Sequence, residues 1–184
     1  MNTRTVAIIG VFAALGIVLN VSPLKVPAPY APFLIYQIWE IPIVVAFLLY
    51  GTRVGGLITV INTIALLALF PGALPTGPLY NMAAILSMLL GIGMMKTLVE
   101  QHSLKHDAIV ATLFTASGVA LRTTIMTIVN YALLRYPPPI GYGMEEGVII
   151  AGIPLIAAFN ITLALYTIPI AYSLAKAVKS YIKP

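Results

Sequence analysis

The segment AIVATLFTASGVALRTTIMTIVNYALL, residues 108–134, indicates the fold class most clearly, because it is long, apolar and interrupted by a single charge, Arg122. A helix needs about 20 mostly apolar residues to cross the hydrocarbon core of a bilayer. The stretch exceeds that length, and Pro and Gly residues follow it at 137–143. It therefore predicts a membrane-spanning helix that ends at this loop.

The same criteria of length, apolar composition and flanking Pro, Gly or charge divide the rest of the chain into similar segments. The chain is 60% hydrophobic and 8% charged, whereas soluble domains carry about 25% charged residues. The segment at 41–50 is short, with an alternative start within 35–40. We interpret the segment at 3–21 as a retained span and not as a cleaved signal peptide. We predict an all-α integral membrane protein, one domain over 1–184 with six transmembrane helices. The predicted spans are 3–21, 41–50, 54–70, 79–99, 108–134 and 148–178.

The connections between these segments differ in composition and charge. Three are rich in Pro and Gly, at 22–32, 70–78 and 136–143, whereas the basic residues gather mainly in the other connections and at the two ends. Cytoplasmic segments of membrane proteins carry the excess of Lys and Arg. We therefore predict that both termini are cytoplasmic and that the three Pro/Gly loops share the outer face. These loops either form a lid over an outward-opening cavity or only connect helices.

Arg122 is the most informative single residue because a charge near the middle of a membrane costs about 2.5 to 3.5 kcal/mol. Such a residue needs a partner in the bundle interior or in a wet cavity. One interpretation is a structural ion pair, with Glu40 as the candidate carboxylate, and the other is a contact with a ligand. Glu40 itself is either an acid favoured at a helix start before Pro42 or part of the site.

Four amides also fall within apolar runs, at Asn62, Asn81, Asn130 and Asn160. A buried amide needs hydrogen bonds from another helix or from a ligand. Arg122, Met126 and Asn130 are spaced four residues apart, so they lie on one stripe of a helix. That stripe suits a polar ligand with a flat aromatic part.

The first segment carries a small-xxx-small pair, Gly10 and Ala14. Small residues let helices approach closely in lipid, where packing drives association. The pair either packs within the same bundle or offers a groove to a partner subunit.

Several other chemistries have little support. The chain has no cysteine, and the only metal-like spacing is His102 with His106, without a third ligand. It has no phosphate-binding Walker motif, no serine-hydrolase or zinc-protease motif and no paired catalytic carboxylates. The basic residues fall singly between apolar runs, so they do not form a nucleic-acid-binding patch.

Six short motifs occur in the order seen in one family of membrane proteins. Together they resemble the substrate-binding S components of energy-coupling factor (ECF) vitamin transporters, most closely the riboflavin type. The motifs are GVFAA at 10–14, QIWEIPI at 37–43, YGTRVGGL at 50–57, TGPLYN at 76–81, MTIVNY at 126–131 and PLIAAFN at 154–160.

The resemblance implies a subunit in the plasma membrane of a prokaryote that binds a vitamin on its outer side. It implies association with a transmembrane coupling subunit and two cytoplasmic ATPases, which drive its toppling. It also implies ligand roles for Asn130 and Asn160, with Glu40 and Thr76 near the loop lid, and coupling-subunit contact for Gly10 and Ala14. The full set of expected ligand residues is Glu40, Thr76, Asn81, Arg122, Met126, Asn130, Tyr131 and Asn160.

One position departs from the family, which usually has a Lys three residues after the last Asn, where Leu163 stands here. Arg122 is a candidate for the missing cation. We expect a non-enzymatic subunit that captures riboflavin or a related flavin, holds no resident cofactor or metal, and binds no nucleic acid. The alternatives are an S component for another vitamin or nucleobase-like compound, and an intramembrane enzyme or structural subunit.

Overall fold

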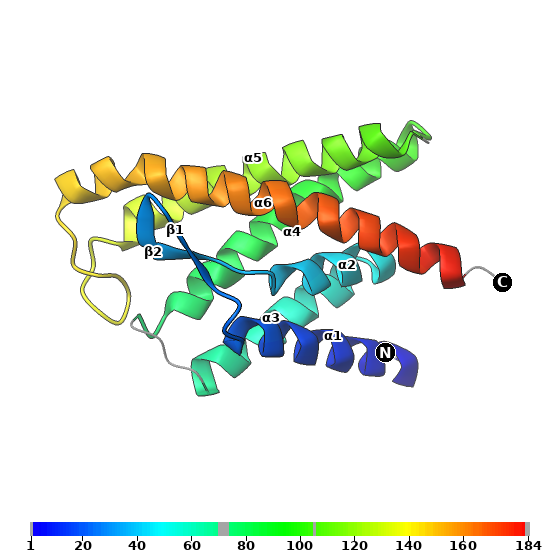
Figure 1. Cartoon of the computed structure of the whole chain (residues 1–184), viewed down its shortest axis with the longest axis horizontal. Coiled ribbons are helices and arrows are strands. Elements are labelled where there is room, and N and C mark those ends of the chain that lie inside the picture. Colours follow the sequence, from blue (N-terminus) through cyan, green and yellow to red (C-terminus); the bar gives the residue numbers. More distant parts are fainter. Residues whose placement is uncertain (1, 70–73, 105, 183–184) are drawn as a thin grey trace.

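The computed structural model describes residues 2–69, 74–104 and 106–182, and it contains six helices and one two-stranded hairpin within them (Figure 1). Helices account for most of this part of the chain. The elements are α1 Thr3–Val21, β1 Val26–Ala28, β2 Ala31–Tyr36, α2 Glu40–Tyr50, α3 Thr52–Leu69, α4 Gly77–Gln101, α5 Asp107–Leu133 and α6 Glu146–Ile182.

Local sequence signals explain where several helices begin and end. Asn2 caps α1, because its side chain accepts a hydrogen bond of 2.9 Å from the backbone N–H of Thr5. Glu40 begins α2, where a carboxylate is favoured by the helix dipole. Gly51 ends α2 with a φ of 93°, a conformation that favours glycine, and α3 follows at once.

The observed helices agree with the predicted spans to within a few residues at most ends. The largest difference is α6, which continues to Ile182, beyond the predicted end at Val178. Phe70, the predicted end of the third span, lies outside the described residues. Five helices are long and apolar enough to cross a membrane. The remaining one, α2, has 11 residues and measures about 16 Å, which is shorter than a hydrocarbon core of about 30 Å.

The prediction of an all-α chain was wrong in one segment, the connection between α1 and α2. There β1 and β2 pair antiparallel, with Val26 opposite Tyr36 and Pro27 opposite Ile35. The prolines of this segment exclude a helix, as predicted, but a two-stranded ribbon has only edge strands, which accept proline. Val, Ile and Tyr favour the extended conformation, so the segment is ordered as a hairpin.

The elements are arranged with two distinct ends, visible in Figure 1. The loop end holds the hairpin, the start of α4 and the connection between α5 and α6. The terminal end holds the start of α1, the end of α6, the α2–α3 turn and the α4–α5 turn. The described parts of the three Pro/Gly connections therefore share one end, as expected.

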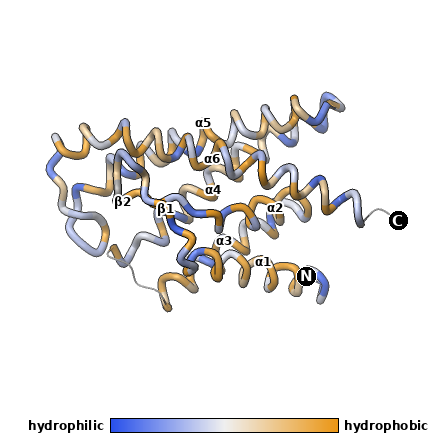
Figure 2. Tube along the Cα trace, in the orientation of Figure 1, coloured by the Kyte–Doolittle hydropathy of each residue, from blue (hydrophilic) through white to orange (hydrophobic). Residues whose placement is uncertain are grey.

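In the bundle α5 packs between α4 and α6, α2 packs between α6 and α3, and both α1 and α4 pack against α3 (Figure 1). Phe47 of α2, Ile85 of α4 and Ile168 of α6 are fully buried members of the core. Many large apolar side chains, such as Val11 and Leu90, are instead exposed. Figure 2 shows apolar residues along the helices and polar ones mainly at their ends. This distribution is typical of a protein solvated by lipid.

Candidate functional site

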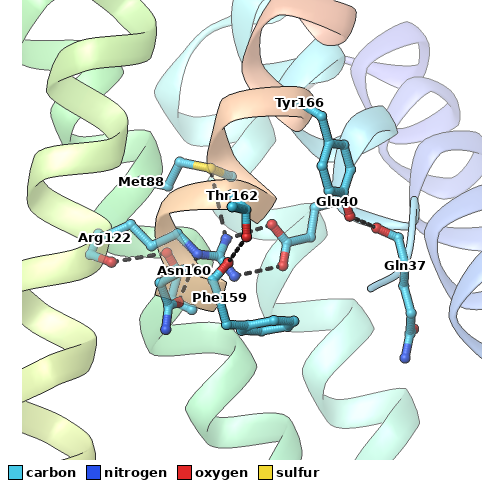
Figure 3. A network of polar contacts seen from close by, with 10 residues as sticks. Gln37, Glu40, Met88, Arg122, Phe159, Asn160, Thr162 and Tyr166 are labelled. Atoms are coloured by element: carbon cyan, nitrogen blue, oxygen red, sulfur yellow. Dashed lines mark hydrogen bonds and ion pairs between the residues drawn. The ribbon is translucent and has the colours of Figure 1, made fainter. Parts of the chain in front are cut away.

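A buried ion pair lies in the interior and joins α2 to α5 (Figure 3). The guanidinium of Arg122 donates from Nη1 to Oε2 of Glu40 at 2.5 Å and from Nη2 to Oε1 of Glu40 at 3.0 Å. Its Nε donates to Oδ1 of Asn160 on α6 at 3.0 Å. The three residues are 2–4% exposed. We call Glu40, Arg122 and Asn160 the Arg122 centre.

The Arg122 centre balances the charge of the arginine within the bundle. A bidentate pairing matches the planar guanidinium to the two carboxylate oxygens, and Nη1 also lies 3.8 Å from the sulfur of Met88 on α4. The sequence hypothesis that Arg122 pairs with Glu40 is therefore confirmed. Because Glu40 neutralises Arg122, the guanidinium is not an unpaired cation in this structure.

Neighbouring contacts hold the partners of Arg122 in place. The Nδ2 of Asn160 donates to the carbonyl of Ile156 one turn earlier, at 2.9 Å, which orients its Oδ1 toward Arg122. The hydroxyl of Tyr166 donates to the carbonyl of Gln37 at 2.5 Å, just before the helix that begins at Glu40. Asn160 and Tyr166 both lie on α6. This helix therefore orients the amide that contacts Arg122 and also holds the segment that leads into Glu40.

A chain of hydroxyl groups fastens the hairpin to α6. Tyr36 of β2 lies 2.6 Å from the hydroxyl of Tyr30 and 2.5 Å from that of Thr162. Its ring also packs on Phe159, with centroids 4.9 Å apart. No local sequence pattern marks Thr162 or Tyr166 as part of the site, because their partners are more than 120 positions away in the chain.

Met126 and Asn130 extend from the Arg122 centre along α5 toward the loop end. Met126 is buried, one turn after Arg122. Asn130 is half-buried, and its Nδ2 donates to the carbonyl of Met126 at 2.7 Å. The stripe of Arg, Met and Asn predicted from spacing is thus present on α5.

The remaining expected ligand residues lie at the loop end. Thr76, at the start of α4, donates from its hydroxyl to the carbonyls of Pro139 and Ile140 in the connection between α5 and α6. Asn81 is exposed on α4. These contacts attach the start of α4 to a Pro/Gly loop.

Tyr131 is 40% exposed and donates to Oε1 of Glu146 at 2.7 Å. The guanidinium of Arg135 lies 4.8 Å from the centre of its ring. The structure therefore separates the eight expected ligand residues into a buried group, Glu40, Arg122, Met126 and Asn160, and a loop-end group, Thr76, Asn81, Asn130 and Tyr131.

The fourth amide singled out in the sequence, Asn62, is buried on α3 beside Gly16 of α1. The two residues expected to contact a partner, Gly10 and Ala14, are exposed on α1. A Cβ placed on Gly10 would meet nothing within 4 Å. The small-residue pair therefore does not pack against the described residues of this bundle. This disfavours the interpretation that the pair serves helix packing within the same bundle.

Comparison with known proteins shows a structural likeness that extends over the full length of the chain. The solved structure of the S component of a bacterial ECF transporter superposes with a TM-score of 0.79 and 22% sequence identity, covering 100% of both chains. At this identity the likeness establishes a shared fold. No protein-family model matches the chain, and no curated protein matches it by sequence.

Proposed function

We propose that this chain is the substrate-binding subunit of an ECF-type importer and that it captures riboflavin or a related flavin. The observation that carries the proposal is the end-to-end likeness to an S component, which covers every element of the fold. The order of six sequence motifs supports it independently of the superposition. The subunit would reside in the cell membrane of a prokaryote, with both termini in the cytoplasm.

The ligand would enter from the loop end and rest above the Arg122 centre, between the hairpin and α5. Met126 and Tyr131 would pack against the flat ring system, since apolar and aromatic side chains provide most of the area of small-molecule sites. Amide groups would hydrogen-bond the polar parts of the ligand and set its orientation. Binding and conformational change, without chemistry on the ligand, would be the whole of the mechanism.

The hydrogen-bond inventory distinguishes the roles of the two key amides. Asn160 already uses its Oδ1 with Arg122 and one N–H with Ile156. Asn130 uses one N–H with Met126, which leaves its second N–H and its Oδ1 available within the described part of the chain. Asn130 would therefore be the direct polar contact, and Asn160 would act largely by holding Arg122.

Riboflavin binding is tested by quenching of flavin fluorescence on titration with the purified protein in detergent. We expect saturable quenching, and a loss of affinity of about tenfold or more for Asn130→Ala, the cost of a hydrogen bond in a buried site. The thermal stability of this variant should stay near that of the parent. Asn160→Ala should lose both ligand affinity and stability. The matched control, Asn20→Ala in the last turn of α1, should bind normally.

A failure of quenching would defeat the flavin assignment. Mass spectrometry of the small molecule that co-purifies with the protein would then separate another vitamin from a nucleobase-like compound. If no small molecule co-purifies or stabilises the protein, the substrate-binding role itself is wrong. Unchanged affinity in both asparagine variants would remove the site assignment and leave the subunit class intact.

The partners would be a transmembrane coupling subunit and two cytoplasmic ATPases, with contact through Gly10 and Ala14. Because these residues are exposed on α1, Ala14→Trp should block uptake in cells that carry the complete transporter while ligand binding persists. Leu90→Trp, which places the same side chain at an exposed position on α4, is the control. Normal uptake by Ala14→Trp would contradict the proposed contact.

A further inference from the structure

A groove runs between α1 and α3 near the terminal end, apart from the site described above. Its volume is about 640 Å³, within the range of small-molecule sites. Figure 1 shows α1 lying along α3, with the starts of both helices at the terminal end. We call this cavity the α1–α3 groove. Its lining residues are Thr5, Ile8, Ile9, Tyr50, Arg53, Val54 and Leu57.

The lining changes from polar to apolar along the groove. Thr5 begins the α1 wall and Ile9 lies about 6 Å deeper, at 1.5 Å per residue. On the other wall Arg53 lies in the first turn of α3, and Leu57 is one turn deeper. Thr5 and Arg53 are therefore at the mouth, and the apolar side chains extend from it toward the middle of the bundle.

The mouth of the groove carries a cation that no acid of the described chain neutralises. Arg53 is exposed, and it takes part in none of the three ion pairs of the described residues. Arg4 adjoins Thr5 at the same end. The chain has five acids. Glu40 is the only acid that precedes α4 in the sequence, and it is bonded to Arg122. The other four acids belong to α4–α6 and their connections.

We propose that the α1–α3 groove binds an anionic phospholipid. Its phosphate would accept hydrogen bonds from Arg53 at the mouth, and one acyl chain would cover Ile8, Val54 and Leu57. Arginine suits phosphate because its planar fork donates two parallel hydrogen bonds. Basic pockets between membrane helices bind anionic headgroups in this manner. The inference needs only the membrane location of the chain and is independent of the transported ligand.

A second groove at the same end provides an internal contrast. It lies between the start of α5 and the end of α6 and includes Lys176, whose ammonium is bonded to Asp107. The cation there is already neutralised, so the α1–α3 groove is the better site for an anion. Lys179 of α6 is exposed at this end, is not part of either groove, and serves as a charge-matched control position.

Native mass spectrometry of the full chain in detergent tests the proposal, with phosphatidylglycerol and phosphatidylcholine of identical acyl chains added in parallel. We expect preferential retention of phosphatidylglycerol. Arg53→Gln should reduce that preference about fivefold, the effect of about one basic residue at a membrane surface, and Lys179→Gln should leave it unchanged. Leu57→Trp, which fills the apolar part, should weaken retention of the lipid while Arg53 is intact.

Glycerol phosphate, which has the anion without acyl chains, should not compete at equal concentration. Equal retention of the two lipids by the parent protein would overturn the proposal. Equal losses in Arg53→Gln and Lys179→Gln would do so as well, because they would show a diffuse charge effect. A thermal scan of each variant verifies folding, and a lipid preference that survives both Arg53→Gln and Leu57→Trp in folded protein would also refute the site.

Discussion

Arg122 and Glu40 lie 82 positions apart in the chain, and two hydrogen bonds of 2.5 and 3.0 Å join their side chains in the interior of the bundle. Glu40 is the first residue of α2, the helix too short to cross a membrane alone. The pair therefore anchors the start of this helix to α5, and Asn160 extends the connection to α6. The loop-end hairpin directly precedes this anchor.

Removal of one partner of the pair should be costly. In Arg122→Gln, the carboxylate of Glu40 would remain buried without its cation, and breaking such pairs costs about 3–5 kcal/mol. The measurement is the free energy of unfolding in mixed micelles. The double variant Glu40→Gln with Arg122→Gln should recover part of the loss, because no unpaired charge remains. If Arg122→Gln is as stable as the parent, the pair does not support the fold.

The approach of α4 to α5 depends on Gly91. A Cβ at this position would lie 2.4 Å from the carbonyl oxygen of Ser117, so Gly91→Ala should force the helices apart and cost about 1–3 kcal/mol. Gly152→Ala is the control, because a Cβ there meets nothing within 4 Å, and alanine favours the helix. Thermal unfolding in detergent should separate the two variants. Equal melting temperatures would argue against close packing at Gly91.

The attachment of the hairpin should weaken when the hydroxyl of Tyr36 is removed. Tyr36→Phe retains the ring contact with Phe159 but loses the bonds to Tyr30 and Thr162, each worth about 1 kcal/mol. We expect faster hydrogen exchange and proteolysis at 26–36. Tyr142→Phe, at an exposed loop-end tyrosine, should have no such effect. Unaltered exchange in Tyr36→Phe would show that the hydroxyl chain does not hold the hairpin.

Single cysteines can determine the topology, because the natural chain has none. In intact cells a membrane-impermeant maleimide should label Tyr142→Cys at the loop end, whereas Ser103→Cys in the α4–α5 turn should react only after lysis. Thr52→Cys, at the first residue of α3 after the α2–α3 turn, should behave like Ser103→Cys if the hairpin and α2 together complete a crossing. Labelling of Ser103→Cys before lysis would reverse the proposed orientation. A difference between Thr52→Cys and Ser103→Cys would contradict six crossings.

The residues that sequence analysis located best were those governed by local rules. The helix at 107–133 was predictable because its run of apolar residues satisfies the length of a bilayer, and a helix in lipid bonds its own backbone. Asn130 and Met126 could be placed on one face from their spacing alone, since that spacing follows from the geometry of the helix. The need of Arg122 for a partner could also be inferred from its depth.

The identities of the contacts required the tertiary structure. Glu40 was one candidate partner for Arg122, and the role of Asn160 as its second acceptor had no local sign. Thr162 and Tyr166 escaped notice because hydroxyls on an apolar helix acquire meaning only from what packs against them. The hairpin was missed because proline patterns exclude a helix without specifying the pairing that replaces it.

Local sequence was therefore sufficient to predict which segments become helices, where most of them end and which residues need polar partners, because these depend on nearest neighbours along the chain and on transfer into lipid. The packed bundle was needed to show that Glu40 and Asn160 meet Arg122, that the hairpin is attached to α6 through Tyr36, and that Gly10 and Ala14 are exposed. Those outcomes depend on how helices distant in the chain pack together, and packing is a property of the whole bundle.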